Sequence, residues 1–448
     1  MSFPRYPHYK NSGETWLGDV PDTWAVCALG YRFEVALGKM LDEKQITGKF
    51  LYPYLRNVDV QWGKINIAEL PQMDFEGNDL NRYSLRAGDL LVCEGGEVGR
   101  SAIWHSELSE CFYQKALHRL RAHTSKDHPE FLYYVLYAAA KLGIFSGSEG
   151  RSTIAHLTAE TLRRYRFPFP PAEEQAAIVS VLGKECEKID SLINEQRRLI
   201  ELLKEKRQAV ISHAVTKGLN PDAPTRPSGI HWFGGIPQHW TMKPIKLIAR
   251  VCNGSTPSRE EPAYWAEEGF PWLSSAAVNQ EDIYSADEYV TDRALAECTL
   301  PKIEPPAVLV GITGQGRTRG MASTLRIRAT INQHVAAIVP SSTETRADYI
   351  RRYLDTCYNV LRDDSEGGGS TKAAITCEQI SNLRICVPPA IEQEQIVGFL
   401  DRELTKIRLL MEEANRAIDL FQERRYALIS AAITGKIDVR DSVPECVA

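Results

Sequence analysis

The longest regular pattern of apolar positions in the chain runs from residue 170 to residue 216. The spacing of three and four residues is that of an amphipathic α-helix, and only Gly183 interrupts it before Gly218. The apolar positions are Ile178, Leu182, Ile189, Leu192, Ile193, Leu199, Ile200, Leu203, Val210 and Ile211. At about 1.5 Å per residue, this segment predicts a helix about 60 Å long.

The same pattern occurs a second time. Residues 170–216 return without a gap as residues 388–434, with roughly half of the positions identical, which indicates an internal duplication. The apolar positions of the second copy are Ile396, Leu400, Ile407, Leu410, Met411, Ile418, Phe421, Leu428 and Ile429. Because a lone helix with one apolar stripe is unstable in water, the two copies are predicted to pack on each other, antiparallel, as a coiled coil.

The heptad of the first copy supports this packing. Leu182, Ile189, Leu203 and Val210 share one heptad position, and Gln196 is its polar member. Each helix begins with a Pro-Pro pair followed by Glu-Gln, at residues 170–175 and 388–393. Proline is tolerated in a first helical turn, and acidic groups there favour the positive end of the helix dipole. Such a helix pair is either a purely structural hairpin or a spacer that also docks a partner.

The duplication extends beyond the helices. Trp-x-Gly-x-x-Pro-x-x-Trp stands at Trp16–Trp24 and again at Trp232–Trp240, where the tryptophans are expected to brace a turn against the ends of the helices. A mixed, strand-rich stretch follows each motif. In the first stretch the pattern predicts strands at 90–93 and 116–120 and a helix at 131–142, and in the second it predicts strands at 308–311 and 335–339 and a helix at 349–361. Glycine-rich loops at 94–100 and 314–320 follow the first strand of each stretch.

These patterns predict an α+β protein with a pseudo-two-fold internal repeat, in which two long antiparallel coiled-coil helices separate two mixed α/β domains. The predicted segments are domain 1, the central helix, a linker with domain 2, the distal helix and a C-terminal tail. Their boundaries are 1–168, 169–219, 220–386, 387–438 and 439–448.

The composition is that of an ordinary globular protein, with 43% hydrophobic and 25% charged residues. No apolar run approaches the roughly 20 residues of a membrane span, and the N-terminal residues lack the core of a signal peptide, so a cytoplasmic protein without membrane contact is expected. The net charge of −5 argues that any contact with DNA comes from local basic patches. The ten cysteines include no Cys-x-x-Cys pair, which predicts free thiols and no metal. No phosphate-binding loop or base-methylation motif occurs, so the chain is expected to bind without chemistry or cofactors of its own.

Taken together, the repeated motifs resemble the specificity subunit of type I restriction–modification systems along nearly the whole chain. The resemblance rests on the paired Pro-Pro-x-x-Glu-Gln-x-x-Ile starts and on the helix segments 207–212 and 425–430. Within the domains it rests on Pro53–Val58, on Gly254–Pro257, and on Tyr264-Trp265 with Pro271–Leu273. The first domain departs from the second in its opening loop, where Gly38-Lys39 stands in place of Gly254–Pro257.

The resemblance implies two target-recognition domains, each recognising one half of a split site in double-stranded DNA. It also implies that the helices set the spacing and dock two methylation subunits, accompanied by restriction subunits. Those partners would bind S-adenosylmethionine, ATP and Mg²⁺, so the chain itself would be no enzyme. Since phosphates attract Lys and Arg, and bases are recognised by Arg, Lys, Asn or Gln, the candidate DNA contacts are Lys39, Arg100, Lys115, Arg119, Arg151, Arg259, Arg317, Arg319, Asn332, Gln333 and Lys372.

A second interpretation is a protein-interaction scaffold whose two lobes do not bind DNA. The arginines and glycines in the loops favour DNA recognition, whereas the acidic net charge is the one point for the scaffold. A stand-alone nuclease or methyltransferase is disfavoured because its motifs are absent.

Overall fold

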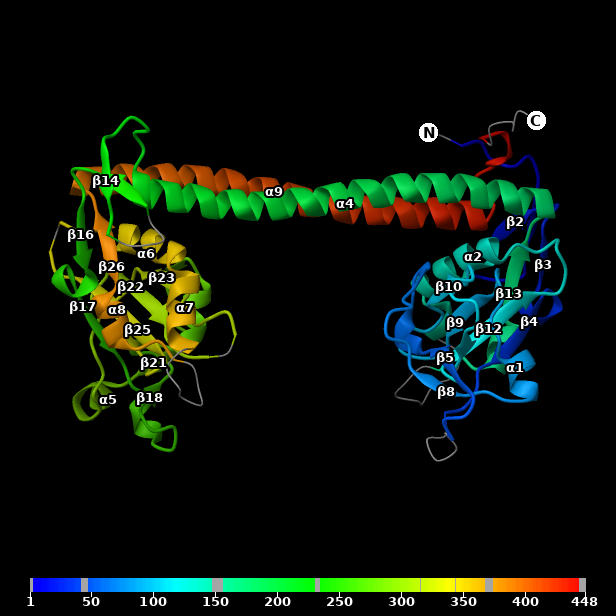
Figure 1. The fold of residues 1–448 in the computed structure, drawn as a ribbon, viewed down its shortest axis with the longest axis horizontal. Coiled ribbons are helices and arrows are strands. Elements are labelled where there is room, and N and C mark those ends of the chain that lie inside the picture. The colour runs from blue at the N-terminus through cyan, green and yellow to red at the C-terminus, as the bar shows by residue number, and fades with distance from the viewer. Residues whose placement is uncertain are drawn as a thin grey trace. The chain divides into compact units, whose positions relative to one another are not determined.

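The computed structural model describes residues 3–41, 47–146, 156–229, 234–314, 316–342, 344–366 and 374–442. The chain divides into two compact units (Figure 1). Unit 1 comprises Met1–Gln196 and Arg416–Ala448, and unit 2 comprises Arg197–Asn415. Each long helix is therefore shared between the units, with one half in each.

The two long helices are α4, Ala172–Lys217, and α9, Ala390–Ile433. The predicted seam is confirmed: Leu182, Ile189 and Leu203 are buried and Val210 is half-buried. Ile193 and Ile200, each four residues after a seam position, are buried as well. The assignment of Leu192, Leu199 and Leu410 to the apolar stripe is wrong, because all three are exposed. Leu192 and Leu199 directly precede the seam residues Ile193 and Ile200, so they flank the seam.

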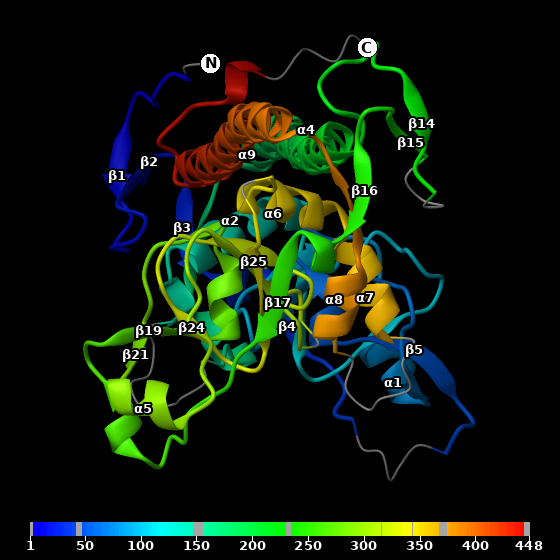
Figure 2. The ribbon, with the colours of Figure 1, turned by 90° about the vertical axis from the view of Figure 1, so that its left-hand side faces the viewer.

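The helices run antiparallel, as predicted. In unit 1 the beginning of α4, with Ile178 and Leu182, shares a core with Ile429 and Ile433 at the end of α9. In unit 2 the end of α4 shares a core with the beginning of α9, which contributes Ile396 and Leu400. Figure 2, which looks along the helices, shows α4 and α9 side by side.

Unit 1 is built on an antiparallel sheet in the order β10-β9-β12-β4, and α2 packs against it. A smaller sheet in the order β11-β5-β8 carries its own aromatic cluster. The bounds of these elements are β4 Phe33–Leu37, β5 Leu51–Leu55, β8 Gln72–Asp74, β9 Leu90–Cys93, β10 Ser101–Ile103, β11 Phe112–Tyr113, β12 Leu117–Ala122 and α2 Pro129–Lys141. The pairs β1–β2, β3–β13 and β6–β7 and two short helices complete the unit. Their bounds are β1 Tyr9–Asn11, β2 Asp19–Pro21, β3 Ala25–Ala28, β6 Val60–Gln61, β7 Lys64–Ile65, α1 Asn78–Arg82, α3 Ala159–Arg164 and β13 Arg166–Phe169.

Unit 2 repeats this plan. Its main sheet has the order β17-β25-β22-β23-β20, its smaller sheet has the order β18-β21-β19-β24, and α6 packs on the main sheet. The bounds are β17 Ala249–Asn253, β18 Trp265–Ala266, β19 Phe270–Leu273, β20 Asp282–Ile283, β21 Glu288–Val290, β22 Ala307–Gly311, β23 Ala322–Leu325, β24 Thr330–Ile331, β25 Val335–Pro340 and α6 Ala347–Thr356. The remaining elements are β14 Thr225–Pro227, β15 Gly235–Pro237, β16 Thr241–Pro244, α5 Asp292–Glu297, α7 Tyr358–Glu366, α8 Cys377–Asn382 and β26 Arg384–Val387.

The predicted strands and the helix of the first stretch are confirmed as β9, β12 and α2, and the strands of the second stretch as β22 and β25. The helix predicted at 349–361 is two helices, α6 and α7, which meet at Cys357. The nine cysteines within the described residues are free, and five of them are buried.

The two tryptophan motifs brace the helix ends, as predicted. The buried Trp24 donates a hydrogen bond from its indole to Glu174 in the first turns of α4, at 2.8 Å. The buried Trp240 lies against Gly218, directly after α4. Gly218 has a φ of +76°, a left-handed conformation that ends the helix and suits glycine. Trp232 lies outside the described residues.

Candidate nucleic-acid interface

Three segments of unit 1 that carry candidate DNA-contact residues meet at one edge of its main sheet. β4 and β9 end at the edge where the antiparallel β12 begins. The Lys115 N–H donates to the Lys39 carbonyl oxygen at 2.8 Å, and the Glu94 N–H donates to the Ala116 carbonyl oxygen at 3.0 Å. The fold therefore joins the segments after β4, after β9 and before β12 into one surface, which we call edge 1 (residues 38–39, 94–100 and 114–116).

Unit 2 forms the equivalent surface, edge 2 (residues 254–259, 312–314, 316–320 and 332–334). β17 and β22 end where β25 begins. The Ile312 N–H donates to the His334 carbonyl oxygen at 3.0 Å, which ties the segment after β22 to the turn before β25. The chain thus builds the same loop junction twice.

A glycine allows each junction to close. A Cβ atom on Gly38 would lie 2.3 Å from the carbonyl oxygen of Gln114, and one on Gly254 would lie 1.6 Å from that of Ile331. No side chain fits at such distances from backbone. Gly38-Lys39 and Gly254-Ser255 therefore perform the same structural task, although their flanking sequences differ.

The basic side chains of edge 1 differ in how far they are engaged. The Lys39 ammonium lies 2.6 Å from an Asp79 carboxylate oxygen and 4.9 Å from the centre of the Phe75 ring. Arg100 is half-buried and donates to the side-chain oxygen of Asn57 at 2.6 Å. Lys115 is exposed, and among the described residues its ammonium has no hydrogen bond or ion pair. Lys115 is therefore the most available cation of this edge.

Edge 2 is lined by a chain of polar side chains. The Thr256 hydroxyl donates to the Gln333 amide oxygen at 2.6 Å, and the Gln333 amide nitrogen lies 3.3 Å from the His334 ring. The other ring nitrogen of His334 lies 2.8 Å from the Thr313 hydroxyl. Gln333 is exposed at the middle of this chain, so its amide is both oriented and accessible.

Arg259 adds an oriented cation to edge 2. Its guanidinium lies 3.8 Å from the centre of the Trp265 ring and 5.1 Å from that of Trp272. It also forms two hydrogen bonds with Glu288, one of them at 3.0 Å. Hydrogen bonding by Arg259 lowers the pKa of the Glu288 carboxyl, which favours the charged pair.

The remaining candidates fall into three groups. Arg317 is exposed on edge 2. Arg119, Arg319 and Asn332 are buried: Arg119 forms an ion pair with Glu34 at 3.0 Å, and Asn332 accepts the His334 N–H at 3.0 Å. Contact of these three residues with DNA stays a prediction, and their burial argues against it. Arg151 and Lys372 lie outside the described residues.

Sequence reasoning missed the residues that orient these side chains. Thr256, His334 and Thr313 connect Gln333 to the sheet, and Glu288 binds Arg259 from a strand far along the chain. Trp265 and Trp272 belong to the motifs that carry the resemblance, but their spacing in the sequence did not predict their contact with Arg259. The one hint of that contact in the sequence was that Gly254–Pro257 lies close to both tryptophans along the chain.

The duplicated Glu-Gln motif joins each domain to its helices. The side-chain oxygen of Gln175 accepts the His128 N–H at the start of α2, at 3.0 Å, and its amide donates to the Pro170 carbonyl oxygen at 2.9 Å. Gln393 accepts the Arg346 N–H at the start of α6 and donates to Pro388, both at 2.9 Å. Both glutamines are buried, so the motif that marks the helix starts also fixes α2 and α6 against them.

The packing of the domain helix on the long helices differs between the units. In unit 1 Tyr133, Tyr134 and Tyr137 of α2 join the core that includes α4 and α9, and the Tyr137 hydroxyl accepts from Arg425 at 3.1 Å. The equivalent positions in unit 2, 218 residues later, are Arg351, Arg352 and Asp355. The same contact is therefore aromatic in unit 1 and ionic in unit 2.

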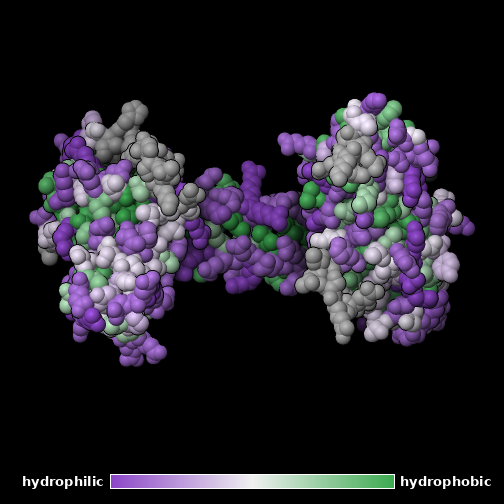
Figure 3. Space-filling view, turned by 90° about the horizontal axis from the view of Figure 1, so that it is seen from below, coloured by the Kyte–Doolittle hydropathy of each residue, from purple (hydrophilic) through white to green (hydrophobic). Residues whose placement is uncertain are grey.

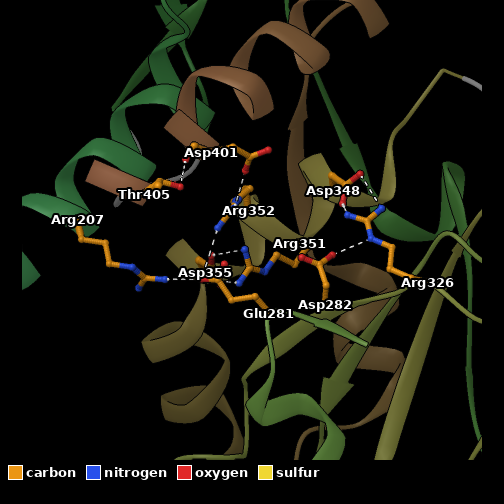
Figure 4. A network of polar contacts seen from close by, with 10 residues as sticks. All are labelled: Arg207, Glu281, Asp282, Arg326, Asp348, Arg351, Arg352, Asp355, Asp401 and Thr405. Carbon is orange, nitrogen blue, oxygen red and sulfur yellow. Dashed lines mark hydrogen bonds and ion pairs between the residues drawn. The ribbon is translucent and has the colours of Figure 1, made fainter. Parts of the chain in front are cut away.

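Figure 4 shows this ionic network. Glu281 lies 3.3 Å from both Arg207 and Arg351, and Arg352 lies 2.7 Å from Asp401 of α9. Burial raises the pKa of Asp355, which outweighs the lowering effect of the nearby arginines. The network borders a cavity of about 920 Å³ between α6, α4 and α9, all within unit 2.

Comparisons with known proteins identify the family. A family model described as the type I restriction modification DNA specificity domain matches residues 21–202 and again residues 237–418. The chain belongs to this family. Each of the two matched segments contains one of the two edges.

One relative of the specificity family matches nearly the full chain, and another matches less than half of it. A putative type I restriction enzyme MjaX specificity subunit from Methanocaldococcus jannaschii is 25% identical over 440 residues, covering 96% of this chain and 97% of the relative. The EcoR124I/EcoR124II specificity subunit from Escherichia coli is 26% identical over 184 residues, which cover 41% of this chain and 45% of the relative.

Solved structures share the fold. A chain from a structure of the complex assembly of a type I R-M system superimposes with a TM-score of 0.71 at 16% identity, covering 92% of this chain and 98% of that chain. The HsdS subunit from Thermoanaerobacter tengcongensis superimposes with a TM-score of 0.56 at 18% identity, covering 93% and 98%. The predicted α+β repeat architecture is thereby confirmed.

Within the described residues, no group of three or more His, Cys, Asp or Glu side chains is arranged to hold a metal ion. In the same part of the chain, no helix is long and apolar enough to cross a membrane.

Proposed function

We propose that this chain is the DNA-recognition subunit of a type I restriction–modification complex, in which each unit recognises one half of a split target in double-stranded DNA. The observation that carries the proposal is the duplicated loop junction, edge 1 and edge 2, whose polar side chains differ while the surrounding strands keep the same order. A duplicated scaffold with divergent exposed side chains suits two different half-sites.

The exposed side chains suit two kinds of DNA contact. Lys115 on edge 1 and Arg317 on edge 2 are exposed cations that suit phosphates, which fix the protein on the duplex without reading its sequence. Gln333 is an exposed and oriented amide, the group that pairs with the donor and acceptor of adenine in the major groove. Both classes of contact are needed for affinity together with specificity.

The helices offer two equivalent docking surfaces for methylation subunits. Leu192 of α4 and Leu410 of α9 occupy duplicated positions, as do Leu202 and Leu420, and all four are exposed. Each unit carries one such leucine from each helix. Figure 3 shows hydrophobic residues, in green, on the helices among hydrophilic residues, in purple. Exposed leucines repeated in both copies suit two copies of one partner.

In this proposal the chain supplies recognition and no catalysis. The methylation subunits would bind S-adenosylmethionine, and restriction subunits would supply ATP- and Mg²⁺-dependent steps. The chain would then act on the reaction only through where it positions its partners.

The proposal is tested by footprinting the chain with its methylation subunits on a cognate duplex. Lys115→Ala is expected to weaken protection of one half-site, and Gln333→Ala is expected to weaken protection of the other. Gln422→Ala, an exposed change on α9, is the control and should leave both intact. A footprint without two separable halves would contradict the proposal and would favour the protein-interaction scaffold.

A further inference from the structure

Arg259 is the most strongly oriented exposed cation of edge 2, and the loop that carries it is fixed from several sides. The Trp272 indole donates to the Ser255 carbonyl oxygen at 3.1 Å, and the Trp265 indole donates to the Ser258 carbonyl oxygen at 3.0 Å. The Ser255 hydroxyl donates to the Thr299 carbonyl oxygen at 3.0 Å. The two tryptophans thus hold the backbone of the loop and stack with its arginine.

An arginine on the surface is stable in water without stacking on tryptophans or pairing with a carboxylate. The Arg259 side chain remains 53% exposed although it stacks on Trp265 and binds Glu288. Stacking restricts the guanidinium to one plane and leaves its donors at the rim, which is the arrangement used for bidentate recognition. The conformational entropy that Arg259 would otherwise lose on binding is therefore largely lost already in the free protein.

Glu288 shows which ligand this guanidinium suits. Both oxygens of its carboxylate accept hydrogen bonds from the two terminal nitrogens of Arg259, so the pair is bidentate. In the major groove of DNA, guanine presents two adjacent acceptors, O6 and N7, whereas adenine, cytosine and thymine each lack such a pair. Among the four bases, only guanine can replace both hydrogen bonds of Glu288.

We propose that Arg259 recognises a guanine in the half-site bound by unit 2, and that Glu288 is a positioning residue that holds Arg259 until guanine replaces it. This inference rests on the proposed function and adds a residue and a base to it. With any other base at that position, Arg259 stays paired with Glu288 and contributes no contact to the DNA.

The test measures binding of the complex with its methylation subunits to four duplexes that differ at one position of the unit 2 half-site, repeated for each position. The wild-type chain is expected to prefer guanine at one position. Arg259→Ala should abolish that preference, a loss of roughly 5- to 150-fold in discrimination, while preferences elsewhere persist. Arg259→Lys should retain part of the affinity but little of the preference, because an ammonium lacks the planar fork.

Glu288→Gln distinguishes the exchange from a general change in charge. Removal of the carboxylate should tighten binding of the guanine duplex more than that of the other three, since only guanine has to break the pair. In an Arg259→Ala background the same change should no longer distinguish the four duplexes. Arg328→Ala, which removes an exposed arginine paired with Glu304 but stacked on no described ring, is the matched control and should keep the guanine preference.

The outcomes separate the two claims. A wild-type complex without any sequence preference would overturn the proposed function itself. A sequence-specific wild type whose guanine preference survives Arg259→Ala would overturn only the role of Arg259. Equal weakening on all four duplexes by Arg259→Ala would also overturn it, because that result describes a phosphate contact.

Discussion

At the scale of single residues, Gln393, which repeats Gln175, shows what a duplicated residue does in the fold. Its buried amide satisfies the Pro388 and Glu344 carbonyl oxygens and the Arg346 N–H. A buried backbone group that loses its partner costs about 1–3 kcal/mol. The side chain therefore couples the start of α9 to the start of α6 through three hydrogen bonds at once.

Gln393→Leu is expected to lower the free energy of unfolding by at least about 2 kcal/mol, since it removes all three hydrogen bonds of the buried amide, including the buried one to Pro388. Denaturant titration followed by circular dichroism measures the loss. Gln422→Leu on the exposed side of α9 is the matched control and should change the stability little. Equal stability of the Gln393→Leu variant and the wild type would mean that other groups or water satisfy the junction.

The residue scale is also where sequence reasoning succeeded least. The spacing of hydrophobic residues predicted the helices and main strands, because burial of one face of an element gives its apolar positions the period of a helix or a strand. It could not distinguish the buried Arg119 and Arg319 from the exposed Lys115 and Arg317. The partners that bury a charged side chain leave no periodic pattern in the sequence around it. Arg259 lies in a loop and depends on Glu288 of β21, 29 residues later, so its role follows only from the folded chain.

At the scale of elements, adjacent leucines of α4 distinguish the seam from the exposed surface. Leu203 is 6% exposed and Leu202 is 52% exposed. Leu203→Glu should destabilise the helix pair by at least about 3 kcal/mol, because it buries a charge without a partner. Leu202→Glu should leave the melting temperature nearly unchanged. A similar loss in both variants, or in neither, would contradict the seam.

The contact between each domain helix and the long helices should respond differently to salt in the two units. Ion pairs such as Arg352–Asp401 weaken as salt screens them, whereas the aromatic contact of Tyr133 and Tyr134 does not depend on charge. Hydrogen exchange measured between low and high salt should therefore show a larger loss of protection in α6 than in α2. Equal responses of α6 and α2 would show that the network of Figure 4 does not govern the packing of α6.

At the scale of the whole molecule, the first and last described segments of the chain belong to the same unit. The Asp438 N–H donates to the Pro4 carbonyl oxygen at 2.8 Å, so these two segments meet in unit 1. There β1 pairs with β2, as β14 of the internal linker pairs with β15 in unit 2. Two segments far apart in the sequence, before Trp24 and after α9, thus form in unit 1 the junction that one continuous linker forms in unit 2.

Continuity of α4 and α9 between the units leads to a prediction about the gap in the DNA target. A heptad inserted after Leu199, with a matching one after Ala417, keeps the seam in phase and lengthens each helix by about 10 Å. That length corresponds to about three base pairs. The variant is expected to keep both half-sequences and to prefer a longer gap, measured by methylation of duplexes that differ only in gap length. A folded variant with an unchanged preferred gap would show that the helices do not set the spacing.

The most direct test of the central claim is selection from a pool of random duplexes by the chain in complex with its methylation subunits, followed by sequencing. Two units whose edges carry different side chains predict two short blocks of fixed bases at a constant separation, with unspecified bases between them. Exchange of edge 2 side chains, for example Gln333→Ala, should alter one block and leave the other. A single contiguous block, or a selected pool without any common sequence, would contradict recognition of a split site by the two units.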